Sequence, residues 1–191
     1  MGQLILLRHG QSILNQENKF TGWADVDLSE QGRREAAKAG EQLKSIQIDQ
    51  VFCSDLKRAL HTAQLVLKAA GQEQCPISQD AALNERHYGD LQGLDKAAMA
   101  EKYGVEQIQL WRRSYDIRPP GGESLKDTYE RVLPYYERVI KPVLQAHRTV
   151  LIVAHGNSLR ALIKELDHKS DAEIVSLEIP TGVPIFYGEP S

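Results

Sequence analysis

The chain has 191 residues, of which 41% are hydrophobic and 26% charged, and its formal net charge is −3 at pH 7. This length and composition are typical of one soluble globular domain with a sizeable core. The slightly acidic balance excludes a globally basic nucleic-acid-binding protein, although it allows a local positive pocket.

The two cysteines and the N-terminus indicate the compartment. Cys53 and Cys75 form neither a C-x-x-C motif nor the even framework of four or more cysteines found in disulfide scaffolds. This favours a reducing cytosol and excludes a zinc site built from thiolates. Only four consecutive apolar residues precede Arg8, too few for a signal peptide, and no segment approaches transmembrane length. We therefore expect a cytoplasmic protein that does not bind membranes.

The N-terminal third alternates strands and helices. The apolar residues 3–7 predict a first strand, and residues 11–27 predict a loop with a short helical turn. Ser29 is a candidate N-cap for an amphipathic helix over 30–45. A second buried strand over 49–54 is followed by a helix over 56–70, which Gly71 ends.

The middle of the chain predicts loops and helices. Residues 77–93 are loop-like, and helices fit 94–103 and 105–115 with Gly104 between them. The turn Pro119-Pro-Gly-Gly122 then breaks the chain.

A long helix is predicted over 124–146, with a kink or break expected from Pro134 and Pro142. The last predicted elements are a strand, a helix and a strand, over 149–154, 157–167 and 173–179.

This order of elements predicts an α/β protein. Fully apolar strands that alternate with helices favour a three-layer α/β/α sandwich with a mostly parallel central sheet. We expect the helical segment over about residues 80–120 to be an insertion that caps the site. No linker separates it cleanly, so we expect 1–191 to form a single domain.

Two apolar runs end in the same dipeptide, one at His9-Gly10 and the other at His155-Gly156. Ligands bind beyond the carboxyl ends of parallel strands, so two such central strands would bring both histidines into one crevice. A single histidine after a strand is more often structural than catalytic. The repeat, together with the adjacent Arg8, favours phosphoryl chemistry.

His9 is the candidate nucleophile, because a neutral imidazole nitrogen can accept a phosphoryl group without a metal. His155 precedes Gly156, Asn157 and the start of a helix, where free N–H groups and the helix dipole bind anions. A protonated His155 would offset charge in the transition state. A capped helix after a core strand would also explain Asn157 and Ser158, but it would not explain the repeated His-Gly.

Arg58 and Glu85 each have two interpretations. Arg58 lies one turn into a helix after a buried strand and could bind phosphate, although an isolated arginine there is usually solvated. Glu85 lies in a loop among cations, where it is either simply ion-paired or a general acid and base. The spacing does not choose between these two roles. Arg112 and Arg113 point in different directions on a helix, so both reach one ligand only near the helix end.

The sequence lacks the motifs by which several classes of ligand are usually bound. The sequence has no G-x-x-x-x-G-K-[ST] segment and no G-x-G-x-x-G after a strand, and its six histidines have no metal-ligand spacing. Its basic residues lack the interleaved aromatic residues of a nucleic-acid surface.

Seven segments, in order along the chain, resemble the cofactor-dependent phosphoglycerate mutases of the histidine phosphatase superfamily. They are residues 7–12, 20–29, 83–93, 100–104, 109–113, 154–161 and 179–184. The R-H-G motif alone indicates only the superfamily, whereas the L-N-E-R-H-Y-G and W-R-R motifs are more specific to the mutases.

The resemblance implies a glycolytic and gluconeogenic interconversion of 2-phosphoglycerate and 3-phosphoglycerate. The reaction would use a phosphohistidine, with 2,3-bisphosphoglycerate as primer and intermediate and with no metal. His9 would carry the phosphoryl group, Glu85 would exchange the proton and His155 would stabilise the transition state, with Arg8 and Arg58 as further catalytic residues.

The resemblance also implies a set of residues that bind substrate. They are Arg8, Gln11, Ser12, Asn15, Thr21, Gly22, Arg58, Glu85, Arg86, His87, Tyr88, Lys96, Arg112, Arg113, Gly156 and Asn157. The partners would be small anionic phosphoglycerates, with no nucleic acid and no membrane, and a homo-oligomer is compatible with the resemblance.

Three departures from the family pattern bear on the site. Gln11 stands where many members have glutamate, and the loop after Pro120 lacks an insertion of about two dozen residues found in longer members. The sequence also ends at Ser191, before the longer tail that covers the site in many relatives. Less cover would admit water, so we expect a more open site or a higher phosphatase side activity. The rival functions are a phosphatase of the same superfamily and an inert binding module on this fold.

Overall fold

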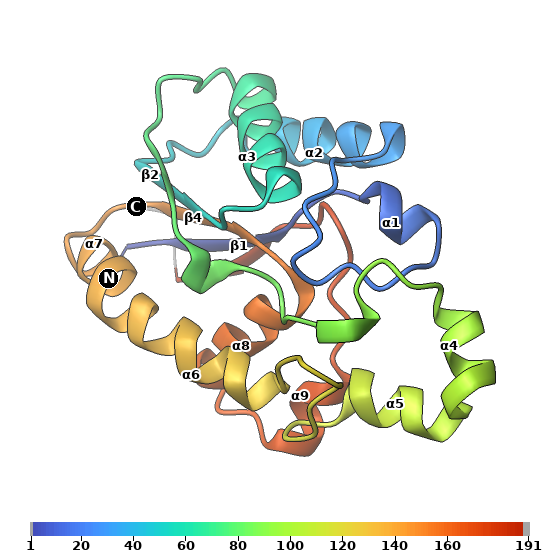
Figure 1. The fold of residues 1–191 in the computed structure, drawn as a ribbon. Helices are drawn as coiled ribbons and strands as arrows, with labels where there is room; N and C mark the ends of the chain where they lie inside the picture. The colour runs from blue at the N-terminus through green and yellow to red at the C-terminus, as the bar shows by residue number, and fades with distance from the viewer. Residues whose placement is uncertain (1, 189–191) are drawn as a thin grey trace.

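The computed structural model describes residues 2–188 and consists of a five-stranded sheet with helices on both faces (Figure 1). The strands are β1 (Leu4–Arg8), β2 (Gln50–Cys53), β3 (Ile77–Gln79), β4 (Val150–Ala154) and β5 (Ile185–Tyr187). The helices are α1 (Ile13–Gln16), α2 (Glu30–Leu43), α3 (Lys57–Ala70), α4 (Lys96–Tyr103), α5 (Val105–Arg113), α6 (Leu125–Tyr135), the π-helical η3 (Tyr136–Ile140), α7 (Lys141–Gln145), α8 (Gly156–Leu166) and α9 (Asp171–Ser176), with the 3-10 turns η1 (Ala81–Leu83) and η2 (Gly89–Leu91).

The strands are arranged in the order β3-β2-β4-β1-β5. β4 pairs in parallel with β1 and β2, β2 pairs in parallel with β3, and β5 pairs antiparallel with β1 at one edge. Helices α2 and α3 cover one face of this sheet, and α6 and α8 cover the other (Figure 1). The three-layer α/β/α sandwich with a mostly parallel sheet is thereby confirmed.

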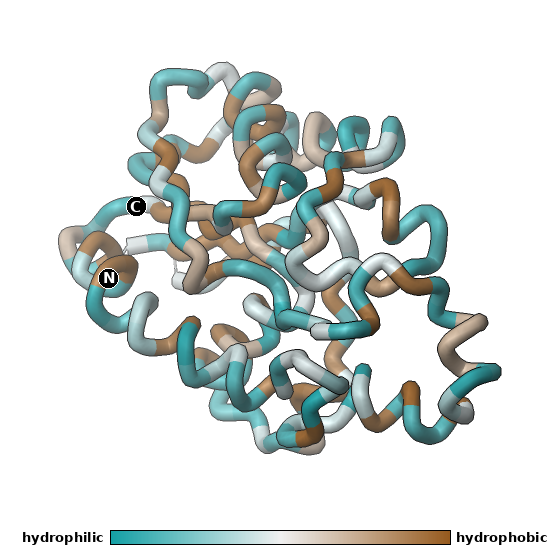
Figure 2. Tube along the Cα trace, in the orientation of Figure 1, coloured by the Kyte–Doolittle hydropathy of each residue, from teal (hydrophilic) through white to brown (hydrophobic). Residues whose placement is uncertain are grey.

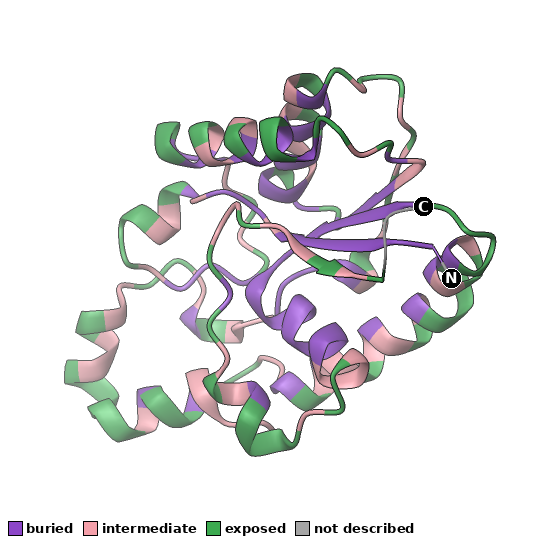
Figure 3. Cartoon of the chain, turned by 180° about the vertical axis from the view of Figure 1, so that it is seen from behind, coloured by how far each residue is buried: buried purple, intermediate pink, exposed green. Residues whose placement is uncertain are grey.

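The unbroken apolar runs follow from burial on both faces. Leu4 and Leu6 pack into the core beneath α6 and α8, whereas Ile5 and Leu7 pack into the core beneath α2 and α3. Successive side chains of a strand point to opposite faces, so a strand covered on both sides must be apolar throughout. The central strands are correspondingly hydrophobic in Figure 2 and buried in Figure 3.

The register of β1 and β4 determines where the two His-Gly pairs lie. Arg8, the last residue of β1, is the partner of Ala154, the last residue of β4. The backbone N–H of His9 continues the pairing by donating to the carbonyl oxygen of Ala154 at 3.0 Å. His9 and His155 therefore leave adjacent strands at the same level.

Local signals explain the helix boundaries. The side chain of Ser29 accepts a hydrogen bond from Gly32 N–H at 3.1 Å and caps α2, as the sequence predicts. Gly71 ends α3 with φ of 69°. The expected interruption after residue 124 is confirmed: α6 contains Pro134, changes into the π-helical η3, and continues as α7 with Pro142 in its first turn.

The predicted strand over 173–179 is wrong, because residues Asp171–Ser176 form helix α9. Ser170 and Glu173 make a capping box that satisfies the first N–H groups of this helix, and this local signal outweighs the apolar residues that suggested a strand. The loop assigned to 77–93 contains the strand β3, and β5 was not predicted. Both are three-residue edge strands, too short to show a periodic pattern.

Helices α4 and α5 stand apart from the sandwich and belong to the segment predicted as a cap (Figure 1). They have a small core of their own, made of Phe20, Leu91, Ile108 and Trp111. Within residues 2–188, no helix has the length and apolar character needed to span a bilayer.

Gly32 of α2 lies against the backbone of the loop after His9. We therefore expect that a side chain at this position would destabilise the protein. A Cβ atom on Gly32 would lie 2.0 Å from the carbonyl oxygen of Gln11. Glycine to alanine in a helix normally stabilises by up to about 1 kcal/mol. Here we expect Gly32→Ala to lower the free energy of unfolding by about 1–3 kcal/mol, measured by urea denaturation. The neighbouring exposed change Gln31→Ala serves as the control and should stay within about 0.5 kcal/mol. A Gly32→Ala protein as stable as wild type would contradict this account.

Candidate active site

A pocket with a free volume of about 110 Å³ lies where β1 and β4 end. Seven cationic side chains line it, namely Arg8, Lys19, Arg58, Lys96, Arg112, Arg113 and Arg160. Two carboxylates, those of Glu85 and Glu178, also line it. Such an excess of positive charge indicates a small polyanionic ligand.

His9 is held in one tautomer by its own loop. Its Nδ1 lies 2.6 Å from the carbonyl oxygen of Gly10, to which only an N–H can donate, so Nε2 carries the free lone pair. The N–H of Gly10 donates to Thr62 Oγ1 at 3.1 Å, which anchors this loop to α3. Burial, followed by the charges of Arg58 and Arg8, lowers the pKa of His9 well below its usual value. His9 is therefore neutral at pH 7, as a nucleophile must be.

His155 lies next to His9, with 4.9 Å between the ring centroids, and is fully buried. Burial lowers its pKa well below the usual value, and the charges of Arg58 and of neighbouring groups act in the same direction. The expectation of a protonated His155 is therefore not met in the protein alone. A neutral imidazole can still donate one hydrogen bond to an anion.

Backbone carbonyls orient the buried Arg58 and the partly buried Arg8 toward the same region. Arg58 donates to the carbonyl oxygens of Ala24 and Gly22, at 3.0 and 2.6 Å, and Arg8 donates to that of Ile179 at 2.8 Å. The Nε atoms of both arginines are buried and have no partner among residues 2–188. Burial lowers the pKa of Arg58 to about 10, so it remains charged at neutral pH. An anion that accepted these N–H groups would remove the cost of leaving them unpaired.

Glu85 lies in the pocket without a cationic partner. Its Oε1 accepts the backbone N–H groups of Arg86 and Asn157, at 2.8 and 3.0 Å. Within residues 2–188 no ion pair involves Glu85, and no hydrogen bond reaches its Oε2. This geometry favours the acid–base role over that of a paired carboxylate.

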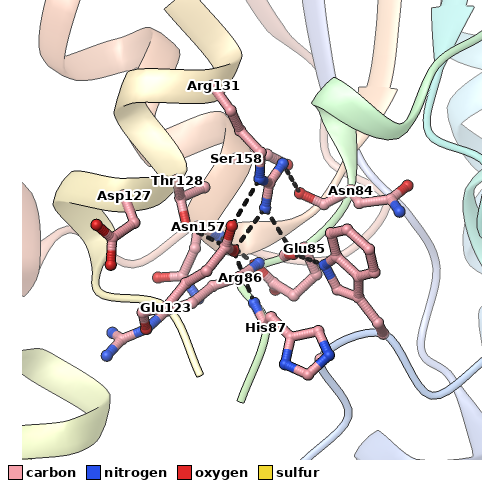
Figure 4. Close-up of polar contacts among 12 residues, drawn as sticks. Asn84, Glu85, Arg86, His87, Glu123, Asp127, Thr128, Arg131, Asn157 and Ser158 are labelled. Carbon is pink, nitrogen blue, oxygen red and sulfur yellow. Dashed lines mark hydrogen bonds and ion pairs between the residues drawn. The ribbon is translucent and has the colours of Figure 1, made fainter. Parts of the chain in front are cut away.

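Arg131 of α6 holds the loop that carries Glu85 (Figure 4). Its guanidinium donates to the carbonyl oxygens of Ala82, Asn84 and Glu85, at 2.8, 3.1 and 2.9 Å. It also forms two hydrogen bonds with the carboxylate of Glu123, at 2.9 and 2.8 Å. One side chain thus fixes the backbone on either side of the candidate acid–base group.

Most of the residues expected to bind substrate line this one pocket. They are Arg8, Asn15, Thr21, Gly22, Arg58, Glu85, Tyr88, Lys96, Arg112, Arg113, Gly156 and Asn157. Arg112 and Arg113 are the last two residues of α5, which is the arrangement that lets adjacent arginines share a ligand. Burial, aided by Arg112, lowers the pKa of Lys96 to about 8.

Gln11, Ser12, Arg86 and His87 do not line the pocket. The side-chain oxygen of Gln11 accepts from Ser29 Oγ at 2.8 Å, and the hydroxyl of Ser12 caps α1. Arg86 donates to the carbonyl oxygens of Glu123 and Ile117. Nδ1 of His87 accepts the N–H of Gly89 at 2.9 Å, and its ring packs on Trp23.

The structure adds residues that the sequence did not suggest, namely Lys19, Phe20, Arg160 and Glu178. Arg160 donates to Asn157 Oδ1 at 3.2 Å from within α8. Arg160 lies two residues after Ser158 on a helix that begins at the site, and this position in the sequence could have indicated that it reaches the pocket. Glu178 forms an ion pair with Arg113 at 2.8 Å, and no local pattern in the sequence marks it.

Comparison with known sequences shows what this chain is similar to. The sequence model described as the histidine phosphatase superfamily (branch 1) matches residues 4–183. The chain is 56% identical over 186 residues to a 2,3-bisphosphoglycerate-dependent phosphoglycerate mutase of Mesorhizobium japonicum, covering 96% of this chain and 90% of that protein. It is 53% identical to the protein of the same name in Sphingopyxis alaskensis, covering 98% and 92%. That alignment spans 211 residues, more than this chain has, so the second relative contains an insertion.

Solved structures with the same fold are more distant in sequence. A mycobacterial glucosyl-3-phosphoglycerate phosphatase complexed with VO3 has a TM-score of 0.86 and 31% identity, covering 97% of this chain and 92% of that one. The Bacillus stearothermophilus protein YhfR has a TM-score of 0.84 and 28% identity, covering 97% and 90%.

The lowered pKa values of the two histidines predict a loss of stability in mild acid. The unfolded chain takes up protons as the pH falls through about 6.5, whereas His9 and His155 in the folded protein resist protonation until lower pH. The contribution of these two histidines to the free energy of unfolding is therefore complete above pH 6.5. It is lost as the pH falls toward their folded-state pKa values. We expect a slope that approaches about 1.4 kcal/mol per pH unit for each histidine, measured by denaturation at a series of pH values.

The double variant His9→Asn/His155→Asn should lose most of this slope. His168→Asn, which changes an exposed histidine, should keep it. An unchanged slope in the double variant would show that other groups cause the acid sensitivity.

The contacts of Arg131 predict a local effect on the Glu85 loop. Arg131→Lys removes the planar fork that reaches several carbonyls at once. We expect faster amide exchange over residues 84–87 and a decrease of about 1–3 kcal/mol in the free energy of unfolding. Arg118→Lys changes an exposed arginine bonded to Asp127 and should leave both quantities nearly unchanged. Equal exchange rates in the two variants would refute the role of Arg131.

Proposed function

The chain belongs to branch 1 of the histidine phosphatase superfamily, and we propose that its pocket is the active site of a 2,3-bisphosphoglycerate-dependent phosphoglycerate mutase. The enzyme interconverts 2-phosphoglycerate and 3-phosphoglycerate. The observation that carries this proposal is that neutral His9, Glu85 and seven cations line one small pocket, while the buried, neutral His155 lies directly behind this lining, with its ring centroid 4.9 Å from that of His9. Identities of 56% and 53% to proteins of that name support it.

His9 performs the covalent step. Its Nε2 lone pair forms a bond to phosphorus while the bond between phosphorus and the departing oxygen breaks. The carbonyl of Gly10 retains the hydrogen on Nδ1 and favours the positive charge that develops on the ring. The reverse step returns the phosphoryl group from His9 to a substrate hydroxyl.

Glu85 exchanges the proton that this transfer requires. Its Oε2 removes the proton of the attacking hydroxyl when His9 gives up the phosphoryl group, and it protonates the departing oxygen in the opposite direction. The N–H groups of Arg86 and Asn157 fix Oε1, so the carboxylate keeps one oxygen available.

The charge on the phosphoryl oxygens is offset by groups that are already in place. Arg8 and Arg58 are anchored by carbonyls, so they need little reorganisation when a phosphoryl group arrives. An imidazole nucleophile with two arginines suffices for the transfer without a metal. Lys96, Arg112 and Arg113 reach the pocket from the cap and would hold the substrate carboxylate and the phosphate that does not react.

The residues present also suit 2,3-bisphosphoglycerate. Buried Nε atoms of Arg8 and Arg58 and the buried hydroxyl of Thr21 have no partner among residues 2–188, and cations come from both the sheet and the cap. When bound, this molecule supplies the phosphoryl group that loads His9. Arg8 and Arg58 would hold the phosphate next to His9, and Arg112 and Arg113 the rest of the molecule.

The cap segment and the cysteines support two further parts of the proposal. We infer a single domain in which residues of about 80–120 act as a cap, because α5 and the Glu85 loop both contribute to the pocket. We also infer a cytoplasmic site of action from the two free cysteines.

A phosphatase is the second candidate, favoured by the solved structures of similar fold that carry that name. It would use the same histidines and arginines but would transfer the phosphoryl group of His9 to water. Glu85 and the cationic end of α5 are more fully used by a mutase, because a hydroxyl acceptor must be deprotonated and the retained molecule must be held.

Coupling to enolase tests the proposal directly. With 3-phosphoglycerate as substrate, the wild-type protein should form 2-phosphoglycerate, faster when 2,3-bisphosphoglycerate is added. His9→Ala should reduce the rate by about a thousandfold or more, because the nucleophile is lost. His168→Asn is the control that should retain the wild-type rate.

Glu85→Gln keeps a side-chain oxygen for the Arg86 and Asn157 N–H groups but cannot take up a proton, so we expect kcat to fall by about 10²–10⁴-fold. Release of phosphate without 2-phosphoglycerate would favour the phosphatase. Activity that survives His9→Ala would refute the covalent mechanism.

A further inference from the structure

Ser54 contacts the ring of His155 from the end of a third strand. β2 pairs with β4 so that Cys53 is the partner of Val153, and Ser54 follows directly after this pair. Its Oγ lies 2.6 Å from Nε2 of His155, and both residues are fully buried. Neither the sequence motifs nor the mechanism above assigns a role to this serine.

The surrounding hydrogen bonds indicate the direction of this contact. The N–H of Leu56 donates to Ser54 Oγ at 3.3 Å, so the hydroxyl oxygen already accepts one bond. If the hydroxyl donates to Nε2, the neutral imidazole has its hydrogen on Nδ1, and that N–H is the only polar group of the Ser54 and His155 side chains left without a partner among residues 2–188.

The opposite direction leaves more groups unsatisfied. With the hydrogen on Nε2, the Ser54 hydroxyl would have no acceptor among the described residues, and the Nδ1 lone pair would also be unpaired. Each buried unsatisfied polar group costs about 1–3 kcal/mol, so the Nδ1–H tautomer is favoured.

We propose that Ser54 is a positioning residue, whose hydroxyl keeps the hydrogen of His155 on Nδ1 and so makes the neutral imidazole a hydrogen-bond donor beside His9. The identity of the acceptor, a phosphoryl oxygen, rests on the proposed function; the tautomer does not. His155 then needs no positive charge of its own to stabilise the phosphoryl group.

The two histidines thereby use one tautomer for opposite purposes. In His9 the carbonyl of Gly10 occupies Nδ1 and leaves the Nε2 lone pair as nucleophile. In His155 the hydroxyl of Ser54 occupies Nε2 and leaves the Nδ1 hydrogen as donor. The Gly10 carbonyl thus makes His9 a nucleophile, and the Ser54 hydroxyl makes His155 a hydrogen-bond donor.

The ¹⁵N chemical shifts of the histidine rings test this assignment in the protein without substrate. The signals of His155 are identified by their loss in His155→Asn. We expect a protonated Nδ1 and an unprotonated Nε2 in wild type, and a shift toward the Nε2–H tautomer in Ser54→Ala. Ser158→Ala is the matched control, because the Ser158 hydroxyl contacts the backbone N–H of His155 at 3.1 Å and not its ring.

Activity supplies a second readout. Ser54→Ala should lower kcat by about 10–100-fold with little change in KM, by analogy with the partners that orient metal-bound histidines, because the His155 ring would lose the contact that fixes its tautomer. Ser54→Thr, which keeps the hydroxyl, should recover the wild-type tautomer and most of the rate.

A wild-type protein with the hydrogen on Nε2 would overturn the proposal without any variant. Ser54→Ala with unchanged ring signals would also overturn it. If the wild-type protein released phosphate but formed no 2-phosphoglycerate, the mutase function would fail, and the ring signals would still decide the role of Ser54.

Discussion

The last residues of β1 and β4, Arg8 and Ala154, are partners across two parallel strands, and each is followed by a histidine. The site depends on this register, because it brings side chains that are far apart in the sequence to one end of one sheet. A slip by one residue would turn every side chain of β1 to the opposite core and would remove His9 from its neighbour. The cores on both faces oppose such a slip, since all five residues of β4 are buried. The packing that stabilises the fold therefore also places the two imidazoles.

The arginines of the site are oriented mostly by backbone carbonyls and not by carboxylates. Arg8, Arg58 and Arg160 donate to the carbonyl oxygens of Ile179, Gly22 and Leu177, among others. A carbonyl fixes the direction of a guanidinium without neutralising its charge. The positive charge thus remains available to a ligand. Burial lowers the pKa values of His9 and His155, and the charges of Arg58 and Arg8 act in the same direction. In the proposed mechanism, the same arginine charges stabilise the transferring phosphoryl group.

The sequence was sufficient for the central strands, the caps of α2 and α3 and both histidines, because these depend on long apolar runs and local hydrogen bonds. It was insufficient for the edge strands of the sheet and for helix α9. β3 and β5 have three residues each, and α9 begins with a capping box that an apolar pattern conceals. In the site, Glu85 could be assigned only by resemblance, since its freedom from ion pairs is a tertiary property. Arg86 and His87 share its motif, yet their side chains serve the loop itself. Ser54 was missed because its contact with His155 exists only once β2 lies beside β4.

The ion pair between Arg113 and Glu178 gives the pocket a counter-ion of its own. Glu178 is largely exposed, so its carboxylate can leave Arg113 at small cost when another anion arrives. A ligand that binds Arg113 therefore replaces the carboxylate of Glu178 and does not bind an arginine that lacks a counter-ion. Such an exchange discriminates by charge: a ligand with a single weak anionic group gains little over the resident carboxylate, whereas one with several displaces it. The ion pair thus selects against small monoanions and favours ligands with several anionic groups.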